Sequence, residues 1–197
     1  MARQLPPARE RILKAAARLF QGAGIRATSL DAIAEHAGLT KRTVYYHFRS
    51  KDDLIAAYLA ARDEPNLALF QCWFAEGEGD AAARVESIFR HLAKAARHPA
   101  WRGCGFLRTS VELVDQPGHP AVVAARRHKK RVEAWLAGVF QEGRNGQEAE
   151  ALARHIMLLL DGAFAVVLLH RDPSYLDSAG EAAACLIRSF ALVGAEM

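Results

Sequence analysis

The segment from Thr28 to Leu54 constrains the fold of this chain more than any other stretch of similar length. It holds three helix-start signals, because Thr28, Thr40 and Ser50 each stand where a side-chain oxygen can accept a hydrogen bond from a first helical turn. Gly38 lies between the first two signals and is the residue type that most easily adopts the left-handed conformation ending a helix. The segment therefore predicts two short helices joined by a tight turn, followed by a third helix.

The predicted helices also have apolar faces at helical spacing. Asp31 and Asp53 follow the first and third caps by three residues, a shorter-armed version of the capping box. The inward-facing residues of the first two helices recur every three or four positions: Leu30, Ile33, Ala34 and Ala37, then Val44 and Phe48. A helix, a glycine turn and a second helix is the plan of a helix-turn-helix.

The second short helix, predicted over 41–48, is crowded with long donors, hydroxyl groups and flat rings. A helix of this size fits the DNA major groove, where Arg42 can donate two hydrogen bonds to guanine. The alternative is a solvated basic helix in an ordinary bundle, but solubility alone does not explain two tyrosines beside a histidine. The predicted DNA-binding residues are Thr28, Ser29, Thr40, Lys41, Arg42, Thr43, Tyr45, Tyr46, His47 and Lys51.

A wider set of short motifs surrounds this helix pair: Leu19-Phe20, Gly24, Thr28-Ser29-Leu30, Ile33-Ala34, Ala37-Gly38-Leu39-Thr40, Val44-Tyr45-Tyr46-His47-Phe48 and Ser50-Lys51-Asp52-Asp53-Leu54. With these motifs the chain resembles the TetR family of bacterial transcriptional repressors over about its first third. The resemblance implies a homodimer that binds a palindromic operator. It also implies that Tyr45, His47 and Lys51 hold the phosphate backbone, while Lys41, Arg42 and Tyr46 lie nearest the bases.

The composition is that of an ordinary globular protein, with 197 residues, 51% hydrophobic and 24% charged. Repeated helical periodicity predicts an all-α fold of about nine helices. An N-terminal three-helix DNA-binding domain over 1–54 is followed by a larger helical ligand-binding and dimerisation domain over 55–197. The helices outside the helix-turn-helix are expected at about 7–22, 51–76 with a kink or break at Pro65, 80–97, 103–115, 119–143, 148–170 and 175–195.

Charge is distributed unevenly along the chain. Residues 1–62 contain 11 Lys and Arg against 5 Asp and Glu, whereas residues 63–197 contain 15 against 17. The positive charge therefore surrounds the helix-turn-helix, where a polyanion would be met. Three widely spaced cysteines and a basic N-terminus without an apolar core favour a cytoplasmic protein over a secreted one.

The predicted eighth helix is apolar on nearly every side from Ile156 to Leu169, a run shorter than the roughly 20 residues of a membrane span. A helix of this kind must be covered all round, so we expect it to pair with the last helix in a four-helix dimer interface, as the family does. The alternative is that both helices are core of a single chain. The predicted interface residues are Leu152, Ile156, Leu159, Leu160, Val166, Val167, Leu186, Ile187, Phe190 and Val193.

The resemblance further implies a small-molecule pocket within residues 65–197. Aromatic residues on inward-looking faces can line such a pocket or fill the core, and the sequence does not separate the two roles. Glu112 lies four residues from Arg108, so a salt bridge within the helix is its alternative role. The predicted pocket residues are Phe70, Trp73, Phe74, Phe89, Phe106, Glu112, His128, Trp135, Asp161 and Phe164.

Other functional classes receive little support. The basic run over 126–131 spreads around more than a helical turn, so we interpret it as a solvated surface rather than a second nucleic-acid site. Cys104 is either a redox switch or a small buried residue. No metal site, cofactor or catalytic motif is predicted, so we expect no enzyme. The predicted function is a dimeric repressor released from DNA by a small effector; the alternative is a DNA-bound adaptor or activator that recruits a protein and binds no small ligand.

Overall fold

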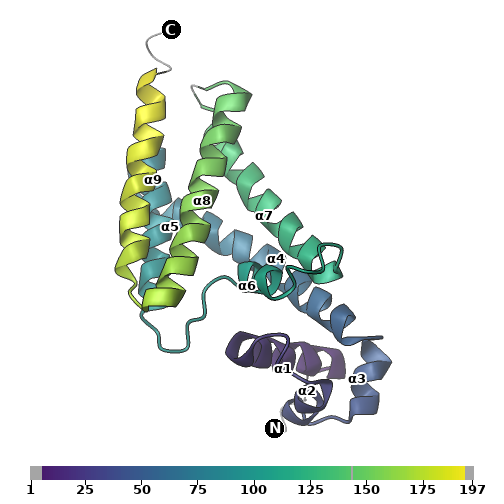
Figure 1. The fold of residues 1–197 in the computed structure, drawn as a ribbon. Coiled ribbons are helices and arrows are strands. Elements are labelled where there is room, and N and C mark those ends of the chain that lie inside the picture. The colour runs from purple at the N-terminus through teal and green to yellow at the C-terminus, as the bar shows by residue number, and fades with distance from the viewer. Residues whose placement is uncertain (1–5, 143, 194–197) are drawn as a thin grey trace, which may run out of the picture. The chain divides into compact units, whose positions relative to one another are not determined.

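The computed structural model describes residues 6–142 and 144–193, and over these residues it contains nine α-helices and no strands. The predicted all-α class is therefore confirmed (Figure 1). The helices are α1 (Ala8–Ala23), α2 (Leu30–His36), α3 (Lys41–His47), α4 (Lys51–Glu76), α5 (Ala81–Ala96), α6 (Gly105–Glu112), α7 (Pro120–Val139), α8 (Gly146–His170) and α9 (Ser174–Val193).

Helix α4 begins and ends where the sequence predicts, and it continues through Pro65, so of the kink or break expected there the break is wrong. Proline has no backbone N–H, so the carbonyl of Ala61 loses its intrahelical donor. Both Ala61 and Pro65 are exposed, so water can satisfy that carbonyl on the solvent side of the helix. One missing hydrogen bond on a solvent-exposed face does not end a helix of 26 residues.

The chain divides into two compact units. The first unit comprises residues up to Asp63 together with Gly105–Arg126, and the second comprises Glu64–Cys104 together with the residues from Arg127 onward. Helices α1–α3 and α6 thus belong to the first unit, while α4 and α7 contribute residues to both. These units are defined by packing, and the functional division near residue 54 remains a prediction.

The first unit has a core made by α1, α2, α3 and the start of α4. Ile12, Ile33, Val44 and Leu54 are each fully buried. Phe20 packs edge-on against Tyr58, with ring centroids 5.4 Å apart. The apolar stripes predicted for these helices therefore do meet one another, and burial of side chains of this size contributes about 1.5–3 kcal/mol each.

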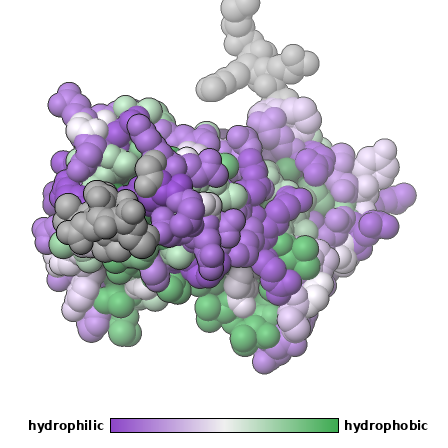
Figure 2. Space-filling model, turned by 90° about the horizontal axis from the view of Figure 1, so that it is seen from above, coloured by the Kyte–Doolittle hydropathy of each residue, from purple (hydrophilic) through white to green (hydrophobic). Residues whose placement is uncertain are grey.

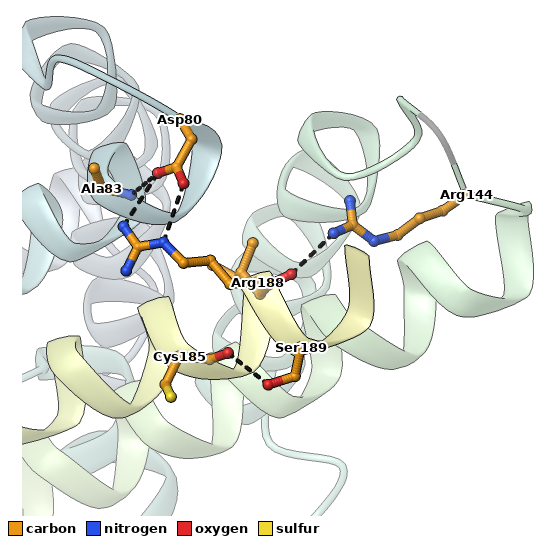
Figure 3. A network of polar contacts seen from close by, with 7 residues as sticks. Asp80, Ala83, Arg144, Cys185, Arg188 and Ser189 are labelled. Atoms are coloured by element: carbon orange, nitrogen blue, oxygen red, sulfur yellow. Dashed lines mark hydrogen bonds and ion pairs between the residues drawn. The ribbon is translucent and has the colours of Figure 1, made fainter. Parts of the chain in front are cut away.

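In the second unit, α9 packs against both α5 and α8. The approach to α5 is close at Gly180, where a Cβ atom would lie 2.8 Å from the Cβ of Phe89. Asp80 joins the same helices at the surface (Figure 3), because its carboxylate accepts from the Ala83 amide at the start of α5 and pairs with Arg188 of α9 at 3.1 Å. The guanidinium of Arg188 holds the pKa of Asp80 below its usual value.

Helix α8 is longer than the apolar run suggests, so the length argument against a membrane span is wrong. It has 25 residues, with a mean hydropathy of 1.9 over its most apolar 18-residue window. Within the described residues it alone passes a length-and-composition test for a span, a test that core helices of soluble proteins also pass. Nine of its residues are buried inside this single chain, among them Leu152, Ile156 and Phe164, which is the pattern of a core helix.

The molecular surface is mixed in character. Figure 2 shows a face on which hydrophilic side chains predominate, with hydrophobic side chains gathered along one edge of the view. The exposed large hydrophobic residues on α8 are Leu158, at 66%, and Leu169, at 76%. They are eleven residues apart, which is close to three helical turns, so they lie on one face of α8.

Candidate nucleic-acid interface

The turn between α2 and α3 is held by backbone and side-chain hydrogen bonds. Gly38 adopts φ +62° after the last residue of α2, as predicted. The amide of Gly38 donates to Glu35 O, and the amide of Leu39 donates to Ala34 O, both at 2.9 Å. This pair of bonds is a Schellman motif, which satisfies carbonyls that a helix end leaves without donors.

Arg11 of α1 completes this helix end. Its Nη2 atom donates to Ala37 O at 2.6 Å and to Gly38 O at 3.0 Å. A positively charged group at a helix C-terminus also interacts favourably with the helix dipole. The turn of the helix-turn-helix is therefore bound to α1 by charge as well as by apolar packing.

The start of α2 differs from the prediction by one residue. Ser29, not Thr28, is the N-cap, and its hydroxyl accepts from the Ala32 amide at 3.1 Å. Thr28 is buried instead, and its hydroxyl donates to Gly24 O at 2.7 Å. The predicted cap at Thr40 is confirmed, since it accepts from the Thr43 amide, and Ser50 caps α4 through the Asp53 amide.

The capped α3 helix presents a polar and aromatic surface. Val44 and Phe48 are buried, as predicted, while Tyr46 is 84% exposed and Tyr45 is 49% exposed. Tyr46 contacts His47 edge-on, with ring centroids 5.1 Å apart. Arg42 is exposed at the N-terminal end of the helix, where a side chain can reach base edges if α3 enters a major groove.

Lys41 is paired before any DNA is present. Its ammonium donates to Asp31 of α2 at 2.8 Å. The hydrogen bond from Lys41 to Asp31, together with the carboxylate charge, raises the pKa of Lys41. Sequence reasoning assigned Asp31 to the helix cap and missed this partner, because periodicity carries no signal about pairs that meet across a turn.

Side chains of helix α6 form hydrogen bonds with the end of α1 and with the loop between α1 and α2. Glu112 accepts from the Ile25 amide at 2.9 Å and the Arg26 amide at 3.1 Å. Arg108 donates to Gln21 O at 2.9 Å, so neither residue uses the helix salt bridge that the sequence offered. Lys51 Nζ lies 3.4 Å from Arg26 O, which places a predicted phosphate contact beside the same loop.

Comparisons with known proteins agree with this geometry. The sequence profile described as "Bacterial regulatory proteins, tetR family" matches residues 12–58, which span the helix-turn-helix. A solved TetR-family transcriptional regulator from Streptomyces coelicolor is 30% identical, with a TM-score of 0.81, covering 93% of this chain and 96% of that one. This chain belongs to the TetR family. It is a DNA-binding transcriptional regulator.

Curated relatives match over only part of this chain. The HTH-type transcriptional regulator SrpR of Pseudomonas putida is 42% identical over 57 residues, covering 29% of this chain. The regulator TtgR, also of Pseudomonas putida, is 38% identical over 93 residues, covering 45%. The matched regions span 27% and 44% of those two proteins' own lengths. The chain therefore matches less than half the length of each of these two relatives.

The pocket residues predicted for this TetR-family protein fall in both units. Phe106 and Glu112 lie in the first unit, and the other eight lie in the second. Within the second unit, Phe74 meets Trp135 edge-on at 5.7 Å, and Trp73 stacks on His91 at 5.2 Å. Phe70 lies 6.0 Å from Trp73, while Phe89 is buried against Gly180.

A second group forms around Phe164. Trp101 stacks on it at 6.1 Å, and the Lys129 ammonium lies 5.8 Å from its ring centroid. Lys129 also pairs with Asp161, and neither side chain is fully buried. His128 is buried beside Lys129 in the chain. Which of these residues line a pocket stays a prediction.

The predicted interface residues also divide into two sets. Leu152, Ile156, Leu160, Val167 and Ile187 are buried within the single chain, as the core alternative expects. Leu159, Val166, Leu186 and Phe190 are half-buried, and the side chain of Val193 lies outside the described residues. The dimer contact therefore stays a prediction, and the exposed Leu158 and Leu169 are apolar positions on α8 that the sequence reasoning did not select.

The remaining sequence interpretations concern the basic run and the cysteines. Lys129, Lys130 and Arg131 pair with Asp161, Glu133 and Glu64 respectively, and His128 is buried, so the run forms no single basic stripe. Cys104 is half-buried, and Cys72 and Cys185 are exposed. A hydrogen bond to Glu76 raises the pKa of Cys72, which disfavours its thiolate.

Proposed function

We propose that this protein is a homodimeric repressor that binds a palindromic operator and is released by a small-molecule effector. The observation that carries the proposal is the α3 surface, in which Arg42, Tyr45 and Tyr46 are exposed on a helix capped at its N-terminus by Thr40. In this proposal two such helices enter successive major grooves about 34 Å apart. The protein acts in the cytoplasm, where its DNA is.

The proposed division between base contacts and phosphate contacts rests on the resemblance to the TetR family. Lys41, Arg42 and Tyr46 are proposed to lie nearest the bases, and Tyr45, His47 and Lys51 to hold phosphates. Four hydroxyl residues are proposed to position α2 and α3 against the DNA backbone: Thr28, Ser29, Thr40 and Thr43. The burial of Thr28 and the capping bonds of Ser29 and Thr40 favour positioning through the local structure over direct contact by their hydroxyls.

The proposed second copy covers α8 and α9. Leu158 and Leu169 are exposed on one face of α8, and apolar side chains of this size are usually covered in an assembled protein. The half-buried Leu159 and Val166 lie between these two residues in the sequence. Burial of a face of this kind against its own symmetry mate makes an isologous dimer.

The effector is proposed to bind aromatic residues of the second unit, with Phe70, Trp73 and Phe74 on α4 among them. Helix α4 is continuous from Lys51 to Glu76 and carries both these residues and a proposed phosphate contact. An effector that prefers a pose of α4 incompatible with the operator spacing weakens DNA binding, and DNA weakens effector binding by the same factor. Coupling of about 1–3 kcal/mol is typical of such systems.

One experiment tests the proposal in stages. Full-length protein is used to select duplexes from a random library, its mass is measured in solution with and without the selected duplex, and small molecules are screened for thermal stabilisation. Recovery of a palindrome by a dimer supports the DNA-binding part. A stabilising compound that also releases the duplex supports the repressor mechanism, whereas a stabilising compound that leaves DNA affinity unchanged refutes it. The absence of any stabilising compound favours the adaptor.

A further inference from the structure

We propose that Asp31 is a specificity-determining residue: its carboxylate holds the Lys41 ammonium at the start of α3 and thereby disfavours contacts of Lys41 with DNA phosphates. The inference rests on the proposed DNA-binding function of α3. It assigns a role to an acidic side chain in the most basic part of the chain. A negative charge there repels the DNA backbone, and the proposed role in specificity accounts for its presence.

The geometry of the pair is determined by both helices of the helix-turn-helix. Asp31 lies in the first turn of α2, Lys41 is the first residue of α3, and their charged atoms are 2.8 Å apart. The Schellman motif at Gly38 and the two hydrogen bonds from Arg11 hold the intervening turn. The two backbone positions are therefore anchored independently of the ion pair, so the pair restricts where the lysine side chain points.

The pair contributes little to folding. Its two side chains are 49% and 66% exposed, and exposed ion pairs are worth little because water and salt screen them. The consequence of the pairing is therefore expected in binding, where a polyanion replaces solvent on that side.

Phosphates and bases place different demands on Lys41. An ammonium that stays on Asp31 brings that carboxylate next to the phosphate, and one that leaves Asp31 exposes the carboxylate to the negative backbone, so a phosphate contact is penalised in either case. A base edge such as O6 or N7 of guanine is uncharged, and an ammonium has three donors, so Lys41 can keep Asp31 and still donate to a base. The arrangement penalises contacts that occur on any DNA and spares contacts that depend on sequence.

The surrounding charges offer a matched control. Glu35 lies one helical turn after Asp31 on α2 and is exposed, and none of the ion pairs found in the described part of the chain includes it. Changing Glu35 to Gln removes the same charge from the same helix without releasing Lys41. A general electrostatic effect therefore appears in both variants, whereas the proposed effect appears only in Asp31→Asn.

The test measures affinities of the full-length wild type, Asp31→Asn, Glu35→Gln, Lys41→Gln and the Asp31→Asn/Lys41→Gln double variant. The probes are poly(dI–dC) and a duplex selected by the wild type from a random library, each titrated between about 50 and 200 mM salt. Thermal unfolding of each variant verifies that it is folded.

We expect Asp31→Asn to bind poly(dI–dC) more tightly than the wild type does. Its preference for the selected duplex over poly(dI–dC) should therefore be smaller. One additional phosphate contact steepens the log–log salt dependence by about 0.9, which is roughly a 3.5-fold difference across that salt range. Glu35→Gln should keep the wild-type slope, and the double variant should have the slope of Lys41→Gln.

Equal slopes for Asp31→Asn and Glu35→Gln would overturn the inference, as would an Asp31→Asn effect that survives in the Lys41→Gln background. Either outcome leaves the proposed function standing, because the wild type still selects its duplex. If the wild type enriches no sequence at all, the proposed function fails and this inference fails with it.

Discussion

Replacement of Glu112 by Ala is expected to loosen the loop between α1 and α2 selectively. The carboxylate accepts from two backbone amides, those of Ile25 and Arg26. Ile25 is 3% exposed, so its amide has little access to water once the carboxylate is gone, while the Arg26 residue is exposed. A hydrogen bond to a charged group contributes about 1.5–3 kcal/mol, and the exposed one contributes less because water can replace it.

The free energy of opening this loop is therefore expected to fall by about 2 kcal/mol. This corresponds to roughly a 30-fold increase in the equilibrium constant for opening. Amide hydrogen exchange at Ile25 and Arg26 measures it directly. Glu112→Gln keeps one acceptor oxygen, replaces the other with an NH2 group and removes the charge, so its effect should be about half as large in free energy.

The position of the tryptophans supplies an internal reference. Trp73, Trp101 and Trp135 all lie in the second unit, so their fluorescence reports on that unit. Glu112→Ala should therefore accelerate exchange at residues 25 and 26 while the tryptophan fluorescence transition changes less. Unchanged exchange at both amides, in a variant that remains folded, would refute the assignment of Glu112 as the loop's anchor.

Four further predictions concern the second unit, α3 and the start of α4. Gly180→Ala should destabilise the protein by about 1–3 kcal/mol, measured by thermal unfolding, because the new methyl group meets Phe89 at 2.8 Å. Asp80→Asn should destabilise at neutral pH, and the difference from wild type should shrink as the pH falls below 3.8, since a carboxylate with a lowered folded-state pKa loses its contribution on protonation. Arg42→Ala should cost roughly 1–3 kcal/mol at one base position, whereas Lys51→Ala should weaken binding to all sequences and reduce the salt slope by about one.

Controls separate these effects from general perturbation. Gly138→Ala in α7 meets no heavy atom within 4 Å and should be neutral or stabilising, because alanine favours helix over glycine by about 1 kcal/mol. A destabilisation by Gly138→Ala equal to that of Gly180→Ala would argue against the close contact of α5 with α9. A pH-independent effect of Asp80→Asn would contradict the lowered folded-state pKa of Asp80. A change of base preference in Lys51→Ala would contradict its role as a phosphate contact.

The helix-turn-helix could be predicted from sequence because its signals are local. Caps at Thr40 and Ser50 and the left-handed Gly38 depend on residues three or four positions apart, a range in which backbone geometry alone decides the contact. The error at Thr28 has the same local origin, since two adjacent hydroxyl residues offer equivalent caps and burial of the first selects the second.

Contacts between distant residues could not be predicted in the same way. Glu112 offers an ordinary salt bridge with Arg108 four residues away, yet the structure gives it two amides 86 and 87 residues away. Likewise, α8 reads as uniformly apolar, so its sequence does not separate the buried Ile156 from the exposed Leu158. Packing of the folded chain, including the contact of α8 with α9, makes that distinction.

The contact of Arg11 with the end of α2 has a consequence for how relatives of this protein can change. A Cβ atom on Gly38 would lie 2.9 Å from the guanidinium of Arg11, and the positive φ at that position already disfavours larger residues. A substitution at 38 therefore requires a shorter or displaced side chain at 11, and loss of the arginine relaxes the spatial constraint on the glycine. We expect these two positions, 27 residues apart in sequence, to covary among relatives, and a mutation tolerated at one to depend on which residue occupies the other.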